Sequence, residues 1–196
     1  MRPRVRLQAA ALAGAVAISV VGAVIWSRTV ADGGPVPDDD VVMDQPGEYV
    51  EPAAGTNPSM AGQRLPDVTV EGADGVARRL QPDGRPMVVN LWYSTCPPCT
   101  RELADLAAVH AAVGEQIRFV GVDPYDTAAT MTSFAAERGV TYELWRDPGF
   151  DFTDALGVVG MPVTLLVDTA GRIVHQQGPI DDDELRALLS ERWGVS

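Results

Sequence analysis

The chain has 196 residues, of which 46% are apolar, and its formal net charge is −12 at pH 7. This length and apolar content suffice for one domain with a buried core. The acidic charge argues against nucleic acid as a partner, because phosphate binding relies on clustered lysine and arginine, and no such cluster is visible. We therefore expect no nucleic-acid function.

The N-terminal 30 residues direct the chain to a membrane. Residues 1–6 contain three arginines, and residues 7–26 form an uncharged, mostly apolar run. As a helix this run would span about 30 Å, the thickness of a bilayer's hydrocarbon core. We expect a single-pass anchor in the cell membrane, with a cleaved signal peptide and a secreted protein as the alternative. The positive-inside rule places the N-terminus in the cytoplasm and the remainder outside it.

Residues 31–63 follow with five prolines, several aspartates and no sustained apolar periodicity. This composition predicts a flexible tether, with a root-mean-square reach of roughly 30 Å. The functional domain is then expected to occupy residues 64–196.

Strand and helix patterns alternate along this domain, which is typical of an α/β fold. In chain order we expect a hairpin from residues 68–70 and 77–80, a buried strand over 87–93, a helix over 97–113, a strand over 117–122, helices over 127–138 and 150–156, a hairpin from 163–167 and 172–176, and a last helix from about 181 to 193. The acidic residues 181–184 suit the positive end of that last helix.

The two cysteines of the chain, Cys96 and Cys99, lie directly after a predicted buried strand and at the start of a predicted helix. The free N–H groups and the dipole of a helix N-terminus would stabilise a Cys96 thiolate and lower its pKa. Cys99 lies about one turn further on the same face, where it can attack a mixed disulfide formed at Cys96. The spacing thus predicts a redox dithiol in which Cys96 attacks and Cys99 resolves.

Other uses of the pair fit less well. A structural disulfide across so short a loop would contribute only about 2 kcal/mol. Zinc needs two further ligands, and His110 and His175 lack a finger-like spacing. Haem attachment needs a histidine where Thr100 stands, a peroxide-reducing cysteine would want a threonine at Tyr93, and no Met- or His-rich cluster supports copper delivery. We expect no metal and no cofactor.

The run Val-Val-Asn-Leu-Trp-Tyr-Ser-Thr-Cys-Pro-Pro-Cys at residues 88–99 resembles the active-site strand and helix start of the thioredoxin superfamily. Glu102 in Cys-x-x-Cys-x-x-Glu, residues 121–123 and residues 160–168 make the chain most similar to the TlpA/ResA/DsbE-like branch, from about residue 64 to 193. The resemblance implies an α/β, thioredoxin-like three-layer fold with a central mixed sheet, an N-terminal hairpin and a strand-helix insertion.

The resemblance also implies roles for residues outside the pair. Met161-Pro162 is expected to be a cis peptide packed beside the dithiol, with the Met161 backbone free to bind an extended substrate. Asn90 replaces the buried aspartate of cytosolic thioredoxins, so Glu102 is expected to tune or exchange protons with the cysteines. Its alternative is an ordinary exposed helix glutamate. Trp92 is expected to flank the site and contact substrate, or else to be a core residue.

The function implied is a thiol-disulfide oxidoreductase that acts on protein thiols or disulfides outside the cytoplasm. We expect a specialised reductase, such as one that serves cytochrome c maturation, with a membrane thiol transporter as electron donor. The alternatives are an oxidant in extracytoplasmic disulfide formation and a redox-inactive binding module. A monomer is expected. Thr95 stands where the family often has tryptophan, which predicts a less aromatic rim around the site.

Overall fold

The computed structural model describes residues 57–195. The predicted anchor, residues 7–26, and most of the predicted tether lie outside this range. Among the described residues, no helix has the length and apolar character needed to cross a bilayer.

The elements alternate along the chain as the α/β pattern predicts. They are β1 (Thr69–Gly72), β2 (Ala77–Arg79), β3 (Met87–Leu91), α2 (Pro97–Val113), β4 (Arg118–Asp123), α3 (Ala128–Ala136), β5 (Glu143–Arg146), α4 (Asp151–Ala155), β6 (Val163–Val167), β7 (Ile173–Gln177) and α5 (Asp182–Trp193). The strands form one sheet in the order β2-β1-β5-β4-β3-β6-β7. Both predicted hairpins are present, β1 with β2 and β6 with β7.

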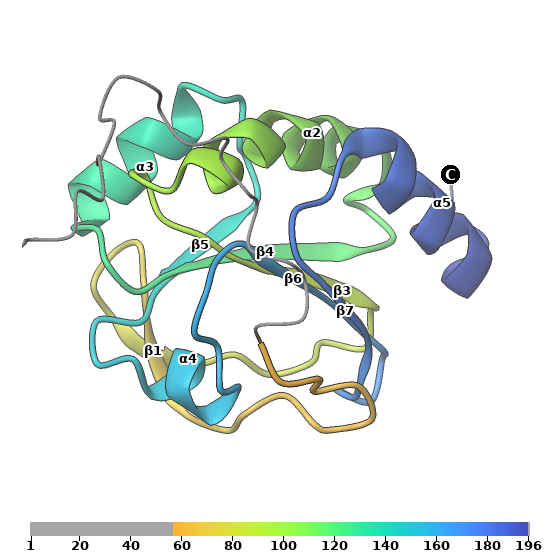
Figure 1. The fold of residues 1–196 in the computed structure, drawn as a ribbon, viewed down its shortest axis with the longest axis horizontal. Helices are drawn as coiled ribbons and strands as arrows, with labels where there is room; N and C mark the ends of the chain where they lie inside the picture. The colour runs from red at the N-terminus through yellow and green to blue at the C-terminus, as the bar shows by residue number, and fades with distance from the viewer. Residues whose placement is uncertain (1–56, 196) are drawn as a thin grey trace, which may run out of the picture. The chain divides into compact units, whose positions relative to one another are not determined.

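The sheet is mixed, with β3 at its centre parallel to β4 and antiparallel to β6. Figure 1 shows α2, α3 and α5 on one face of the sheet and α4 on the other. Side chains of β3 alternate between the two hydrophobic cores, so that Val88 packs under the helices while Val89 and Leu91 pack on the opposite side. The three-layer fold is therefore confirmed.

Strand β5 is the element that the sequence patterns did not predict. It has only four residues, and its charged ends, Glu143 and Arg146, leave Trp145 as the one buried side chain. It becomes a strand because β4 and β1 pair with it on its two sides. Together with α4 it forms a strand-helix unit between α3 and β6.

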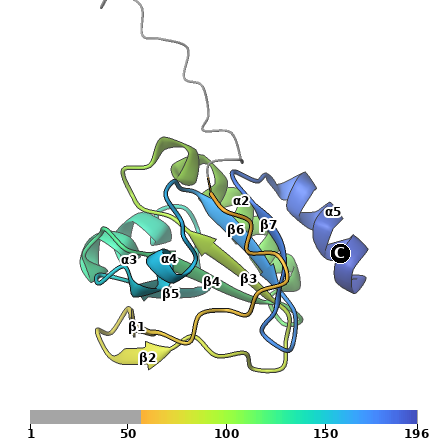
Figure 2. The ribbon, with the colours of Figure 1, turned by 60° about the horizontal axis from the view of Figure 1, so that its bottom comes forward.

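The chain at residues 57–63, which the sequence analysis assigned to the tether, is hydrogen-bonded to the domain. Gly62 N donates to Ile173 O over 2.7 Å, and Ile173 N donates to Gln63 O over 2.8 Å. Figure 2 shows this segment, in orange, running beside β7. Residues 57–63 thus belong to the folded domain.

Candidate active site

The register of the sheet brings two loops that are distant in the sequence together at one end of the strands. Leu91, the last residue of β3, pairs with Val163, the first residue of the antiparallel β6. The loop that leaves β3 toward Cys96 therefore lies beside the loop that enters β6 through Met161 and Pro162. This end of the sheet carries the candidate site.

Cys96 is the N-cap residue of α2 and forms a disulfide with Cys99 in the first turn. The Cys99 backbone N–H donates to Cys96 Sγ over 3.3 Å, and no acidic side chain lies in that turn. Pro97 and Pro98 occupy the first two helical positions, where a missing N–H costs little. Because an N-cap sulfur faces the positive end of the helix dipole, this placement stabilises a Cys96 thiolate once the disulfide is reduced.

The peptide bond between Met161 and Pro162 is cis, the form that the resemblance implies. Met161 O lies 3.6 Å from Cys96 Sγ. The backbone of Met161 is thus next to the sulfur that a substrate would approach.

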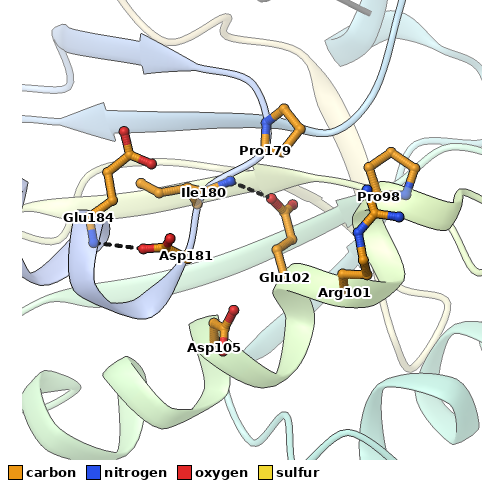
Figure 3. Close-up of a pocket in the computed structure, with 8 residues that line it drawn as sticks. All are labelled: Pro98, Arg101, Glu102, Asp105, Pro179, Ile180, Asp181 and Glu184. Atoms are coloured by element: carbon orange, nitrogen blue, oxygen red, sulfur yellow. Dashed lines mark hydrogen bonds between the residues drawn. The ribbon is translucent and has the colours of Figure 1, made fainter. Parts of the chain in front are cut away.

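Glu102 lies one turn after Cys99 on α2 and is only 3% exposed. Its carboxylate accepts a hydrogen bond from Asn90 Nδ2 over 2.7 Å and another from Ile180 N over 3.1 Å. Figure 3 shows the side chain reaching from α2 toward the Ile180 backbone, at a pocket of about 220 Å³. This burial excludes the alternative of an exposed helix glutamate.

Burial raises the pKa of Glu102 from 4.5 to about 8, and it outweighs the lowering by the hydrogen bonds from Asn90 and Ile180. Asp105, at the same pocket, raises this pKa a little further. A carboxyl with such a pKa can hold a proton at neutral pH and still release it, which is the property a proton exchanger needs.

Trp92 is fully buried and stacks on Phe134 at 6.0 Å between ring centroids. It therefore lies in the core and does not reach the surface that a substrate would contact, which corrects the expected contact role. Thr95, which was expected to make the rim of the site less aromatic, is exposed. The aromatic surface comes instead from Tyr93 and Tyr125, whose rings lie 4.7 Å apart.

A groove of about 320 Å³ lies beside this tyrosine pair and extends to Met161. Two of its lining side chains are the strongly exposed Tyr125 and Val159. Phe150, which packs edge-on against Tyr125, has φ = 60°, a left-handed conformation that is costly for a residue with a side chain. Sequence patterns gave no sign of this groove, because its walls come from four separate loops and from α4.

A second acidic site supports the loop before the dithiol, and it too was not predicted. Asp126 accepts hydrogen bonds from Ser94 N over 2.7 Å and from the Ser94 hydroxyl over 2.8 Å. Asp123, which is fully buried, accepts from the backbone N–H groups of Tyr125 and Asp126, both over 2.9 Å. The sequence signal was residues 121–123, which were noted only as a strand end.

The pKa values of the two carboxyl groups are shifted in opposite directions. Burial, followed by the hydrogen bond with Asp126, raises the pKa of Asp123 to about 7. Burial also acts to raise the pKa of Asp126, but hydrogen bonds from Asp123 and Ser94 outweigh it and hold that pKa below its ordinary value. Asp126 thus keeps its negative charge at neutral pH, whereas Asp123 changes its charge in the neutral range.

The histidines lie apart from this site. His110 packs against the rings of Phe119 and Tyr142, and His175 contacts Gln177. Across residues 57–195 no group of three or more histidine, cysteine or acidic side chains is arranged to hold a metal ion.

Comparison with known proteins gives consistent results. A profile of the Redoxin family matches residues 60–189. The chain is 35% identical over 130 residues to the thiol:disulfide interchange protein HelX of Rhodobacter capsulatus, which covers 64% of this chain and 72% of HelX. It is 27% identical over 116 residues to the thiol-disulfide oxidoreductase ResA of Halalkalibacterium halodurans, covering 58% of this chain and 66% of ResA, slightly less than two thirds of that relative.

Solved structures share the fold. A secreted disulfide oxidoreductase of Mycobacterium tuberculosis, described as homologous to DsbE of E. coli, superimposes with a TM-score of 0.55 at 22% identity, over 64% of this chain and 96% of its own. DsbF of the same organism gives a TM-score of 0.56 at 24% identity, over 64% of this chain and 94% of its own.

Proposed function

Since the chain belongs to the Redoxin family and is a thiol-disulfide oxidoreductase of the ResA, HelX and DsbE type, we propose that it reduces disulfides in proteins outside the cytoplasm, within cytochrome c maturation. The observation that carries the proposal is the Cys96–Cys99 pair at the start of α2, with Met161 O beside Cys96 Sγ. The cytochrome setting is supported by the resemblance to the TlpA/ResA/DsbE-like branch.

In the first step the Cys96 thiolate attacks one sulfur of a substrate disulfide. The substrate S–S bond breaks, a mixed disulfide forms at Cys96, and the released substrate thiolate takes a proton from solvent. The Cys99 N–H at 3.3 Å from Cys96 Sγ and the helix dipole stabilise the attacking anion.

In the second step Cys99 loses its proton and attacks Cys96 Sγ. The mixed disulfide breaks, the second substrate sulfur leaves as a thiolate and is protonated, and the Cys96–Cys99 disulfide remains. Two electrons have then passed from the dithiol to the substrate. Glu102, on the same helix and with its pKa raised to about 8, serves as the base that takes the Cys99 proton.

The substrate approaches as an extended segment along the Met161 backbone. A large apolar side chain beside the attacked cysteine fits the groove of Tyr125, Val159 and Met161. A membrane thiol transporter returns electrons to the pair, and the N-terminal anchor, residues 7–26, keeps the domain near that donor. We expect the protein to work as a monomer.

The reduction potential of the Cys96–Cys99 pair tests the direction of electron flow. Titration of the purified protein against dithiol buffers is expected to give a value near −270 mV, that of thioredoxin. A value near −120 mV, that of a strong oxidant, would overturn the reductase proposal in favour of extracytoplasmic disulfide formation.

Substitution Cys99→Ser separates an enzyme from a redox-inactive binding module. The variant cannot resolve the mixed disulfide, so we expect a partner protein to remain covalently attached to Cys96. Cys96→Ser is the matched control, because it lacks the attacking sulfur. The absence of any trapped species, together with no reduction of insulin by the wild-type protein, would refute the enzymatic function.

A further inference from the structure

Asn57 holds the loop that leads to the cis peptide. Its Nδ2 donates to Gly160 O over 2.8 Å, while its Oδ1 accepts from Val159 N over 2.8 Å and from Gly160 N over 3.0 Å. These three hydrogen bonds join positions about one hundred residues apart in the sequence. One planar amide therefore serves both N–H groups and one carbonyl of the loop.

The loop has few other supports at this point. Val158 N is bonded to Thr153 O in α4, and the chain enters β6 at Val163. Between them, Val159 is 76% exposed, and a Cβ added at Gly160 would meet no atom within 4 Å. Within the part of the chain that the structure describes, the hydrogen-bond partners of Val159 and Gly160 all belong to Asn57.

The segment that carries Asn57 is itself fixed to the domain, and we call residues 57–63 the N-terminal strap. Met60 N donates to Gln176 Oε1 over 2.8 Å, and Gln176 Nε2 donates to Pro58 O over 3.0 Å. The Pro58 ring packs on Gly157 so closely that a Cβ there would come within 2.8 Å of it. The strap thus connects β7 to the loop, with Asn57 at its loop end.

We propose that Asn57 is a positioning residue, which fixes the Gly160–Met161 peptide so that the Met161 backbone can bind an extended protein substrate. This inference rests on the proposed oxidoreductase function and adds a determinant of substrate affinity. Asparagine suits the position because one side chain must both donate and accept. The residue acts through the loop and does not itself take part in sulfur chemistry.

The test compares Asn57→Ala and Asn57→Asp with Gln176→Ala in the full-length protein. Asn57→Asp has nearly the same shape, but its carboxylate cannot donate to Gly160 O. The negative carboxylate instead repels the partial negative charge of that carbonyl oxygen. Gln176→Ala loosens the strap at β7 and leaves the three bonds to the loop in place. Reduction of insulin measures a protein substrate. Reduction of the small disulfide DTNB and alkylation of Cys96 by iodoacetamide measure the intrinsic reactivity of the pair.

We expect both Asn57 variants to raise KM for insulin about 10-fold. A change of this size corresponds to the net free energy of about one hydrogen bond or slightly more. Their kcat, DTNB rate and alkylation rate should stay within about twofold, and Gln176→Ala should stay within about twofold throughout. If Asn57→Ala fails to fold, Asn57→Asp carries the comparison.

Three results would overturn the inference: an unchanged KM in the Asn57 variants, an equal rise in Gln176→Ala, or an equal loss with DTNB and insulin. In each of these the wild-type protein still reduces insulin. A wild-type protein without that activity would instead refute the proposed function, so the two failures are distinguishable.

Discussion

Two acidic sites lie near the dithiol, Glu102 and the pair of Asp123 and Asp126, and they differ in the charge that their carboxyl groups carry. Glu102, on the helix behind Cys99, receives hydrogen bonds from two neutral donors, Asn90 and the Ile180 backbone. Asp126, at the loop before the dithiol, has a pKa below its ordinary value and accepts two hydrogen bonds from Ser94. The lone acid is free to change its charge during the reaction, whereas the paired acid keeps its charge to hold Ser94.

The largest effect is expected in the way the free energy of unfolding depends on pH, and Glu102 is its source. Its pKa is 4.5 when unfolded and about 8 when folded, so the folded state binds the proton more tightly. Stability from this group is fully present below about pH 4.5 and is lost as the pH rises toward 8, by at most about 1.4 kcal/mol per pH unit. In denaturant unfolding from pH 5 to 8, Glu102→Gln should show a smaller slope than the wild type, because the contribution of Glu102 is lost while that of Asp123 remains. Equal slopes would contradict the assignment.

Glu102→Gln should also slow catalysis. Glutamine keeps the size of the side chain but cannot take the Cys99 proton, so resolution of the mixed disulfide should fall about 100-fold, as for other general bases. Rapid-mixing measurements of substrate release would follow this step separately from the attack by Cys96. The exposed Glu115→Gln is the charge-matched control. A variant that resolves at the wild-type rate would leave Glu102 with a structural role only.

Replacement of the paired acid should have a smaller effect. Asp126→Ala leaves Ser94 N and its hydroxyl without their acceptor, which is expected to cost about 1–3 kcal/mol of stability and to lower insulin reduction. Asp123→Asn is the informative counterpart, because an amide at this position cannot titrate. It should leave the hydrogen bonds of Ser94 to Asp126 in place, and it should lose the decline in stability that wild-type Asp123 causes as the pH rises from about 4 to about 7. Similar damage from both variants would contradict the assignment of the Ser94 contact to Asp126 alone.

The smallest effect is expected from Ser94→Ala. This change removes the hydroxyl bond to Asp126 but leaves the backbone N–H bond, so we expect a loss of about 0.5–1.5 kcal/mol and activity within about twofold of wild type. Thermal unfolding and the insulin assay would measure both. A loss as large as that of Asp126→Ala would mean that the hydroxyl, and not the backbone, holds the loop.

Local patterns predicted most of the fold. The helix that begins after Cys96 was predicted with its observed bounds, 97–113, because Pro97 and Pro98 fit a first helical turn and are a local signal. Strand β5 was missed because only its neighbours β1 and β4 make its four residues a strand. For Trp92 both a contact with substrate and a place in the core were open, because sequence cannot tell whether an aromatic side chain near the site points outward or inward.

The sequence by itself determined the dithiol, since the chemistry of Cys96 and Cys99 depends on their spacing and on the helix that starts between them. The resemblance to the TlpA/ResA/DsbE-like branch also marked Glu102. Only the tertiary structure decided that Glu102 is buried, that Asp126 binds Ser94, and that Asn57 holds Gly160. Desolvation is set by all the atoms packed around a group, and these hydrogen bonds join residues that only the folded sheet brings together.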